Sequence, residues 1–392
     1  MLRSQLDQIV EQILAQAPDV SDVIFTVGKP VQLEVHGELR EAQLRPNLGT
    51  LLPFHVHEIA TCLMGRNMRL YRDQVKTGSC DLSYELRGKG RFRVNIFGQK
   101  GSLAIVMRKL SMQVPTMEQL NLPSIFEEMA KEKYGLVLVT GATGTGKSTT
   151  LAALIDCINS TQSKHVITLE DPVEFAHEHK SCTVNQRELG VDFDSFSSGL
   201  RAALRQAPKV ILVGEIRDKE TISIALEAAE TGHLVLGTLH TSDTGQTINR
   251  IIGMFELGEE RLIRGRLAES VKFVVSQRLM PKKGGARVAA FEILRNTIRI
   301  KELINKGEDG EKNFYNVLEA GEAYGMITFD QYLLNLFKSD LISEESAMLN
   351  ASDKSKLHQM IDKVKSERGE KVTEIEGLEL DQSYEASLHK ID

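Results

Sequence analysis

Short apolar runs alternate with longer segments of mixed polarity in the middle of this chain. Runs of strand length occupy residues 136–139, 166–169, 210–213 and 234–236. These runs have no polar alternate face, which is what strands covered on both sides of a parallel sheet require. The segments between them have the length of helices. The pattern therefore predicts an α/β fold built on a buried parallel sheet.

The first hundred or so residues show a different pattern. The apolar side chains of residues 1–18 fall on one helical face that Asp7 and Glu11 interrupt, which predicts an amphipathic helix and not a secretory signal. A second helix is predicted over residues 53–67. Short strands are predicted over residues 22–39, 81–86, 90–97 and 102–110. We expect residues 1–112 to form an N-terminal α+β domain of the PAS-like kind.

Two prolines and the lack of a long apolar pattern predict a domain linker at residues 113–123. We expect the second domain to span residues 124–365 and to be mostly helical beyond about Glu256. Residues 366–392 carry eight acidic and three basic side chains and few large apolar ones. This composition predicts a disordered acidic tail.

The most specific motif is a glycine-rich loop that directly follows the first predicted strand of the parallel sheet. It consists of Gly141, Ala142, Thr143, Gly144, Thr145, Gly146, Lys147 and Ser148, and Thr149 begins the predicted helix after it. Glycines let successive backbone N–H groups point at phosphate oxygens, and the helix N-terminus adds positive potential. Lys147 is expected to neutralise phosphate charge and Ser148 to ligate Mg²⁺. The loop therefore predicts a nucleoside triphosphate site.

Carboxylates follow two further strands of the predicted sheet. A phosphate-binding loop needs such groups to organise Mg²⁺ and the attacking water. Glu170 and Asp171 end one strand, and Glu215 ends another, where Gly214 replaces the metal-binding Asp of many such sites. Glu215 is therefore expected to orient or deprotonate water, with Glu170 or Asp171 completing the Mg²⁺ shell. The alternative for each is a solvated carboxylate in a turn.

Two histidines, His233 and His240, bracket another buried run. A histidine beside a core strand is more often a satisfied structural residue than a catalytic one. A neutral imidazole here could also sense the γ-phosphate, and the spacing alone leaves both interpretations open. Zinc binding is disfavoured because no third ligand lies nearby in the sequence.

Arginines gather on one face of the predicted N-terminal sheet. Residues 90–97 alternate strictly between apolar and polar side chains, so Arg91 and Arg93 share a face, and Arg108 ends the next strand. Guanidinium groups on one face can clamp a phosphoryl group at a domain or subunit boundary. The alternative is an ordinary solvated sheet face.

Composition narrows the class of protein. The chain has 48 Lys and Arg against 54 Asp and Glu, a net charge of −6, no Trp and 5% aromatic residues. This balance provides neither the positive field nor the stacking surface of a nucleic-acid-binding protein. An apolar run of about 18 residues, long enough to span a membrane, is absent. The four widely spaced cysteines favour reduced thiols in a cytoplasmic protein.

Taken in order, several segments resemble the secretion ATPase superfamily, the hexameric ring motors of type II secretion and type IV pili. They are the glycine-rich loop and residues 168–174, 184–188, 200–205, 210–218 and 231–241. The segment 90–95 also resembles the retraction group of PilT and its paralogue PilU. The chain lacks the longer N-terminal region and the four-cysteine zinc motif usual in extension and secretion motors, which again favours the retraction group.

This resemblance implies a homohexameric Mg²⁺-dependent ATPase with a RecA-like P-loop domain, which couples ATP hydrolysis to type IV pilus retraction and twitching motility. The implied partners are an inner-membrane pilus platform protein and a paralogous retraction ATPase. The implied location is cytoplasmic and peripheral, at the inner-membrane base of the pilus, without direct membrane insertion. Neither nucleic acid nor a zinc ion is expected as a ligand.

The resemblance also implies roles for individual residues. Glu215 matches the catalytic glutamate of the family, Glu170 lies in its acidic motif, and the two histidines match positions near the γ-phosphate. Three arginines match positions from which the N-terminal domain reaches the nucleotide: Arg91, Arg93 and Arg108.

Other functions fit parts of the same pattern. A PilU-like accessory ATPase that depends on a partner motor would carry the same loop, as would a pilus extension or secretion ATPase. The net charge and the few aromatic residues disfavour a DNA-handling RecA-like ring. A small-molecule P-loop kinase is disfavoured because no segment resembles a lid over an acceptor substrate.

Overall fold

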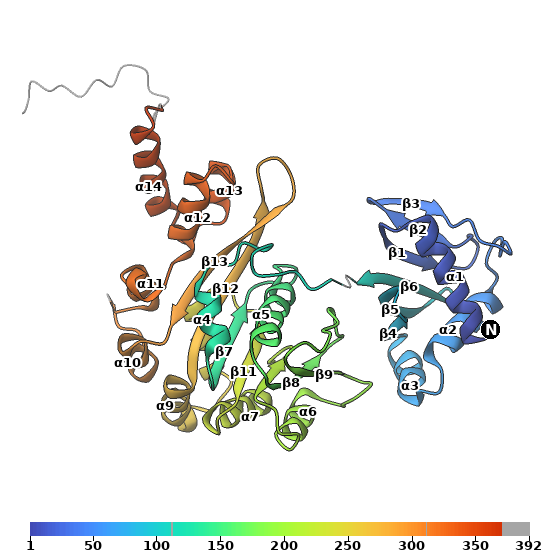
Figure 1. The fold of residues 1–392 in the computed structure, drawn as a ribbon, viewed down its shortest axis with the longest axis horizontal. Coiled ribbons are helices and arrows are strands. Elements are labelled where there is room, and N and C mark those ends of the chain that lie inside the picture. Colours follow the sequence, from blue (N-terminus) through green and yellow to red (C-terminus); the bar gives the residue numbers. More distant parts are fainter. Residues whose placement is uncertain (111–112, 311, 371–392) are drawn as a thin grey trace, which may run out of the picture.

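A computed structural model describes residues 1–110, 113–310 and 312–370. The chain forms two units, each built on its own sheet (Figure 1). The predicted α/β fold, with an N-terminal α+β unit and C-terminal helices, is confirmed. Of the predicted acidic tail, residues 371–392 lie outside the described residues.

The N-terminal unit is a six-stranded antiparallel sheet in the order β3-β2-β1-β6-β5-β4. Its strands are β1 (Val20–Phe25), β2 (Gln32–Val35), β3 (Glu38–Glu41), β4 (Ser79–Leu86), β5 (Gly90–Gln99) and β6 (Ser102–Leu110). Its helices are α1 (Arg3–Gln16), α2 (Pro53–Met64) and α3 (Met68–Thr77). The pattern along the sequence did not predict α3.

One core holds this unit together. The apolar face of α1, including Leu6 and Ile13, is buried against the same cluster as the alternate residues Phe92 and Ile96 of β5. The polar alternates of β5, among them Arg91, are left on the opposite face. This arrangement is the one that a strand period of two requires, and it keeps the arginines away from the core.

The second unit contains a seven-stranded sheet in the order β13-β12-β7-β11-β10-β8-β9, parallel except for β13. Its strands are β7 (Gly135–Thr140), β8 (His165–Glu170), β9 (Thr183–Glu188), β10 (Val210–Val213), β11 (Leu234–Leu239), β12 (Val271–Pro281) and β13 (Arg287–Arg295). Its helices up to β13 are α4 (Ile125–Lys131), α5 (Lys147–Thr161), α6 (Phe196–Ala203), α7 (Lys219–Glu230), α8 (Thr244–Ile252) and α9 (Glu260–Ser270).

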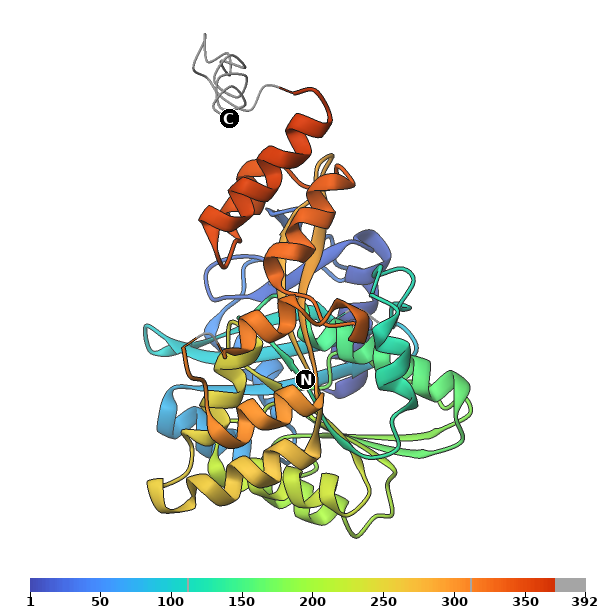
Figure 2. The same cartoon turned by 90° about the vertical axis from the view of Figure 1, so that its left-hand side faces the viewer.

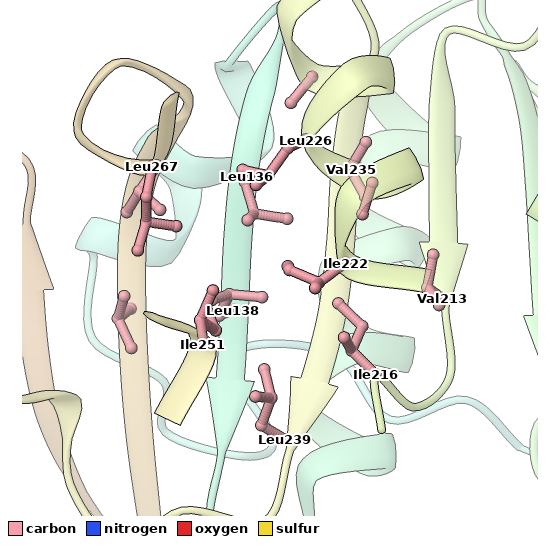
Figure 3. Close-up of a cluster of buried hydrophobic side chains, with 14 of the residues drawn as sticks. Leu136, Leu138, Val213, Ile216, Ile222, Leu226, Val235, Leu239, Ile251 and Leu267 are labelled. Atoms are coloured by element: carbon pink, nitrogen blue, oxygen red, sulfur yellow. The ribbon is translucent and has the colours of Figure 1, made fainter. Parts of the chain in front are cut away.

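Helices cover both faces of this sheet, which explains why its strands are apolar throughout. Leu136 and Leu138 of β7 point into the cluster with α7, α8 and α9 that Figure 3 shows. Val137 and Val139 point to the other side and pack with α4 and α5. A strand buried on both faces has no position for a polar side chain until it leaves the sheet. Polar side chains that could form a site are therefore expected at the ends of these strands.

The expectation of a mostly helical segment beyond Glu256 is wrong for residues 271–295, which form the hairpin β12–β13. The apolar residues of β12 mix with polar side chains that turn out to be buried and hydrogen-bonded, so no strand alternation is visible. The predicted tail also begins slightly too early, because the last helix, α14, runs to Glu367.

Of the helices that follow this hairpin, the first two pack beside α9 and α8, and the last three lie beside the far end of the hairpin (Figures 1 and 2). They are α10 (Ile298–Lys306), α11 (Phe314–Glu319), α12 (Phe329–Lys338), α13 (Glu344–Leu349) and α14 (Lys354–Glu367). The buried carboxylate of Asp330 accepts hydrogen bonds from the backbone N–H groups of Ser352 and Asp353 at 2.8 and 2.9 Å. Among the described residues, no helix has the length and apolar character needed to cross a membrane.

Residues 113–123, between the two units, do not belong to either sheet. Met117 and Leu122 pack against the core of the second unit, on the face that α4 and α5 cover. We therefore propose that residues 113–123 are a linker docked on the second unit, and that the predicted division into two domains holds.

Candidate active site

The glycine-rich loop connects the carboxyl end of β7 to the N-terminus of α5, as its sequence context predicts. Gly141 has a φ of 144°, and a Cβ atom there would lie 2.4 Å from the backbone oxygen of Gln277. No side chain fits at this position. The close approach of β12 therefore shapes the loop that precedes the helix.

Lys147 is the charged centre of this loop. Its side chain is buried, and its Nζ donates hydrogen bonds to the backbone oxygens of Gly141 and Ala142 at 2.8 and 2.9 Å. Burial lowers the pKa of Lys147. The nearby carboxylates of Glu215 and Glu174 act in the opposite direction but do not outweigh burial. The ammonium is thus held over the loop, where phosphate oxygens would meet it.

A cavity of about 1060 Å³ opens over the loop. The predicted residues that line it lie on the loop, at the ends of three parallel strands and on the N-terminal unit: Thr143, Gly144, Gly146, Lys147, Ser148, Thr149, Glu170, Asp171, Glu215, His240 and Arg93. Because the strands are parallel, their carboxyl ends meet at one edge of the sheet. The topology thus brings together groups that the sequence spreads over about a hundred residues.

Glu215 follows β10 and is held by two neighbours. Arg217 lies 2.5 Å from its Oε1 and donates to its Oε2 at 2.6 Å, and His240 Nε2 lies 3.0 Å from Oε1. Local sequence explains the geometry. Asp218 caps α7 by accepting a hydrogen bond from the Thr221 N–H at 2.8 Å, so the chain turns directly after Glu215.

His240 lies between Lys147 and Glu215, and these two neighbours favour one tautomer of its ring. Its Nδ1 lies 3.5 Å from Lys147 Nζ, and lysine has only donors, so Nδ1 accepts. With Nδ1 accepting, the Nε2–H donates a hydrogen bond to Glu215 Oε1, 3.0 Å away. The histidine therefore orients the carboxylate while its own position depends on the lysine.

The electrostatics of Glu215 suit the binding of water better than proton abstraction. Burial alone would raise the pKa of Glu215, but the hydrogen bond from Arg217 and the charges of Arg217, His240 and Lys147 outweigh it and lower that pKa. The group is therefore ionised at neutral pH and a weak base. A fixed carboxylate of this kind can align an attacking water.

Glu170 ends β8 in a more enclosed place. Its Oε1 accepts hydrogen bonds from Thr168 Oγ1 at 2.6 Å and from Gln186 Nε2 at 3.0 Å. Burial nevertheless raises the pKa of Glu170 to about 7. Burial also raises the pKa of the adjacent Asp171, which the charges of Arg93 and Arg217 act to lower. A cation bound next to these two carboxyls would therefore stabilise their ionised forms.

We gave no role to Glu174 from the sequence, although it lies in the segment 168–174 that carries the family resemblance. It lines the cavity, and its charge raises the pKa values of both Lys147 and Glu170. Its carboxylate therefore lies close enough to influence both sides of the site. The signal in the sequence was its place four residues after Glu170, in a segment without regular secondary structure.

The three predicted arginines have different surroundings. Arg93 lines the cavity, and its side chain is half exposed. Arg91 instead pairs with Glu188, at the end of β9. Arg108 pairs with Asp22 of the neighbouring strand β1, with 2.9 Å between Nε and Oδ1. Of the three, only Arg93 lines the cavity, with its Nε 3.9 Å from Asp81, whereas Arg91 and Arg108 pair with carboxylates outside the cavity.

The two predicted histidines do not lie together. His240 follows the carboxyl end of β11, whereas His233 precedes its other end, where Nδ1 lies 3.0 Å from the backbone oxygen of Ala228. The strand between them places His233 on the opposite edge of the sheet from the loop, outside the residues that line the cavity.

Comparisons with known proteins agree with this geometry. Residues 4–328 match the profile of the family described as "Type II/IV secretion system protein". The chain belongs to this family. Over 337 residues, which are 86% of this chain and 94% of the relative, it is 44% identical to the "Type IV pilus retractation ATPase PilT" of Pseudomonas aeruginosa.

The PilT/PilU branch accounts for the other similarities. The chain is 39% identical over 342 residues, 87% of each chain, to the "Type IV pilus ATPase PilU" of the same organism. Its fold matches the structure titled "Crystal Structure of the Pilus Retraction Motor PilT and Bound ADP" with a TM-score of 0.78 and 39% identity. That match covers 91% of this chain and 98% of the solved one. Membership of the PilT/PilU family, predicted from the motifs, is thereby confirmed.

One side chain that shapes the loop of this PilT/PilU-family protein is absent from our predictions. Gln277 of β12 is buried, accepts a hydrogen bond from Thr150 Oγ1 at 2.8 Å and donates one to the backbone oxygen of Thr145 at 2.7 Å. It thereby fastens the loop to the helix that follows. Gln277 lies more than a hundred residues from the loop, and no local motif marks it.

We expect replacement of Gln277 with Leu to weaken ATP binding about thirtyfold, because Thr150 and Thr145 would each lose a hydrogen-bond partner, at about 1 kcal/mol each. Titration with a fluorescent ATP analogue measures this. The matched control is Gln162→Leu, which removes an amide that donates to Ala130, away from the loop. Unchanged affinity of the Gln277 variant would contradict the role.

The residues around the loop also fit a bound Mg²⁺. Ser148 offers an exposed hydroxyl at the start of α5, and Glu170 and Asp171 line the same cavity. Oxygen donors are what Mg²⁺ prefers, and in phosphate sites it takes few protein ligands beside water and phosphate oxygens. Burial raises the pKa of both carboxyls, and a bound cation would stabilise their ionised forms.

Proposed function

We propose that this chain is a Mg²⁺-dependent ATPase that drives the retraction of a type IV pilus. The observation that carries the proposal is the single cavity into which Lys147, Glu170 and Glu215 all face. The combination supplies a phosphate anchor, a cation site and a carboxylate that orients water, which are the parts that triphosphate hydrolysis needs. The names of the relatives support pilus retraction as the work that this hydrolysis performs.

The residues of the chain divide the chemistry between them. The N–H groups of the glycine-rich loop and Lys147 bind the phosphates, and Ser148, Glu170 and Asp171 hold Mg²⁺. When bound, Mg²⁺ neutralises the charge of the phosphates and of the leaving group. Glu215, fixed by His240, aligns water for in-line attack on the γ-phosphorus.

The position of Arg93 suggests how hydrolysis becomes movement. This arginine belongs to the N-terminal unit but lines the cavity of the ATPase unit. A γ-phosphate attracts its guanidinium, and loss of that phosphate releases it. We propose that the N-terminal unit shifts with this change, within a homohexameric ring that acts on a membrane-embedded platform protein at the pilus base.

Two measurements test the proposed function. The purified chain should hydrolyse ATP, and EDTA should abolish the hydrolysis. A deletion strain should have excess pili and no twitching motility, because assembly would continue without retraction. Cells without pili would contradict retraction and favour an extension motor. Hydrolysis only after addition of a paralogous ATPase would favour the PilU-like accessory role.

A further inference from the structure

Glu188, the last residue of β9, joins the two units of the chain. Its side chain is 8% exposed, and Oε2 accepts hydrogen bonds from Arg91 Nη2 at 2.5 Å and from the backbone N–H of Val173 at 3.2 Å. Arg91 belongs to β5 of the N-terminal unit, 97 residues earlier in the sequence. Val173 belongs to the acidic segment, residues 170–177, which begins at the last residue of β8.

Gln186 grips the same acidic segment from the same face of β9. Its Oε1 accepts the backbone N–H of His177 at 2.7 Å, and its Nε2 donates to the backbone oxygen of Phe175 at 2.8 Å and to Glu170 Oε1 at 3.0 Å. Residues 186 and 188 point the same way because side chains alternate along a strand. The acidic segment, which carries Glu170 and Glu174, is therefore held by these two side chains of β9.

A second contact between the units lies next to the first. The guanidinium of Arg69, at the start of α3, covers Gly190, where a Cβ atom would fall 1.7 Å from Arg69 Nη1. Gly190 also has a φ of 82°, in the left-handed region that favours glycine, so a side chain there would strain the backbone and displace Arg69. The N-terminal unit thus rests on the end of β9 through two arginines, both next to the residue that holds the acidic segment.

Because Glu188 is buried, its carboxylate depends on Arg91 for compensation of its charge. A buried carboxylate that loses its ion-pair partner remains desolvated and uncompensated, so the side chain moves to find another donor. Any such movement acts on Val173, because the same oxygen accepts its N–H. Arg91 Nε is itself buried without a hydrogen-bond partner in the described part of the chain, so the pair depends on a single nitrogen of this guanidinium.

We propose that Glu188 is a positioning residue for ATP hydrolysis, which transmits the placement of the N-terminal unit, through Arg91, to the carboxylates of the acidic segment. When the N-terminal unit is seated, Arg91 holds Glu188 and Glu188 holds Val173. When that unit moves, the acidic segment loosens and hydrolysis slows. This proposal rests on the proposed ATPase function and assigns Arg91 to Glu188, not to the nucleotide.

A double-mutant cycle with Glu188→Gln and Arg91→Gln tests the coupling. Each single variant should lower kcat about tenfold with KM for ATP within about twofold, since about 1.4 kcal/mol of positioning is lost without a phosphate contact. The double variant should be no slower than either single one, because both break the same pair. Arg91→Lys, which keeps the charge, should recover at least about a third of kcat. The matched control, Lys89→Gln, breaks an exposed pair with Glu11 within the N-terminal unit and should leave kcat unchanged.

Hydrogen exchange gives a second readout that needs no hydrolysis. In the Arg91→Gln variant the amides of residues 171 and 173–177 should exchange at least about fivefold faster than in the wild-type chain, while those of residues 141–148 should be unchanged. Three results would overturn the proposal. The first is wild-type exchange in that segment, and the second is a fall in kcat in the double variant equal to the product of the two single falls. The third is a rise in KM as large as the fall in kcat. A wild-type chain that fails to hydrolyse ATP would count against the proposed function alone, because the exchange measurement still decides the coupling.

Discussion

Replacement of Glu215 with Gln is expected to reduce ATP turnover about a thousandfold, within the range of about 10²–10⁴ seen when a group that activates or orients water is lost. Gln keeps the size of the side chain but not its charge, so it can no longer fix water through a strong acceptor. Affinity for ATP should stay within about twofold, since Lys147 and the loop are untouched. Steady-state turnover and nucleotide titration of the same preparation separate the two effects.

A matched control for this experiment is Glu220→Gln on α7. Glu220 pairs with Arg201 on the surface, with 2.9 Å between the charged atoms, and it does not line the cavity. Its variant should hydrolyse ATP at the wild-type rate. Undiminished turnover of the Glu215 variant, or a loss of the same size in the control, would show that the carboxylate after β10 is not the one that serves the attacking water.

Replacement of Glu170 with Gln should stabilise the nucleotide-free protein at alkaline pH. Burial raises the pKa of this carboxyl from 4.5 to about 7. Between these values the unfolded chain releases the proton while the folded chain keeps it, so the free energy of unfolding falls as the pH rises, by about 1.4 kcal/mol per unit. The penalty is complete above pH 7, at about 3 kcal/mol. Gln is neutral at every pH and escapes it.

Thermal melting as a function of pH measures this effect. At pH 8 the Glu170 variant should melt about 5 °C above the wild-type chain, and the difference should vanish near pH 5. Its Mg²⁺-dependent turnover should fall at least about tenfold, because the buried charge that costs stability is the one that serves the cation. Glu178→Gln, an exposed change in the neighbouring loop, provides the control. If the melting temperatures of the wild-type chain and the Glu170→Gln variant changed with pH in the same way, the raised pKa of Glu170 would be contradicted.

The parts of the site that could be predicted are those with a local signal. The apolar runs predicted strands β7, β8, β10 and β11, and because parallel strands share a carboxyl edge, the predicted acids and the glycine-rich loop had to meet there. Lys147, Glu170 and Glu215 do share one cavity. The two-residue period of β5 likewise placed the arginines away from the N-terminal core.

The parts that could not be predicted depend on contacts between distant residues. Gln277 fastens a loop more than a hundred residues earlier, and Glu188 meets Arg91 across two units. Gln277 stands in no distinctive local pattern, and Glu188 ends the segment 184–188 that carries the family resemblance, but that segment does not reveal its partner. The two histidines show another limit of prediction from sequence. Residues at the two ends of one strand lie at opposite edges of the sheet, so they cannot share a site there. His233 and His240 look equivalent along the sequence and are not equivalent in space.

The strand β12 connects the glycine-rich loop to the C-terminal helices. Gln277 grips the loop, and the next residue, Arg278, faces the other way and stacks 3.8 Å from the ring centre of Phe329, at the start of α12. Its guanidinium also donates to the backbone oxygen of Asn350. One peptide bond therefore separates the grip on the phosphate loop from the grip on the C-terminal helices. A displacement of those helices would therefore reach the phosphate-binding loop through adjacent residues of one strand, β12.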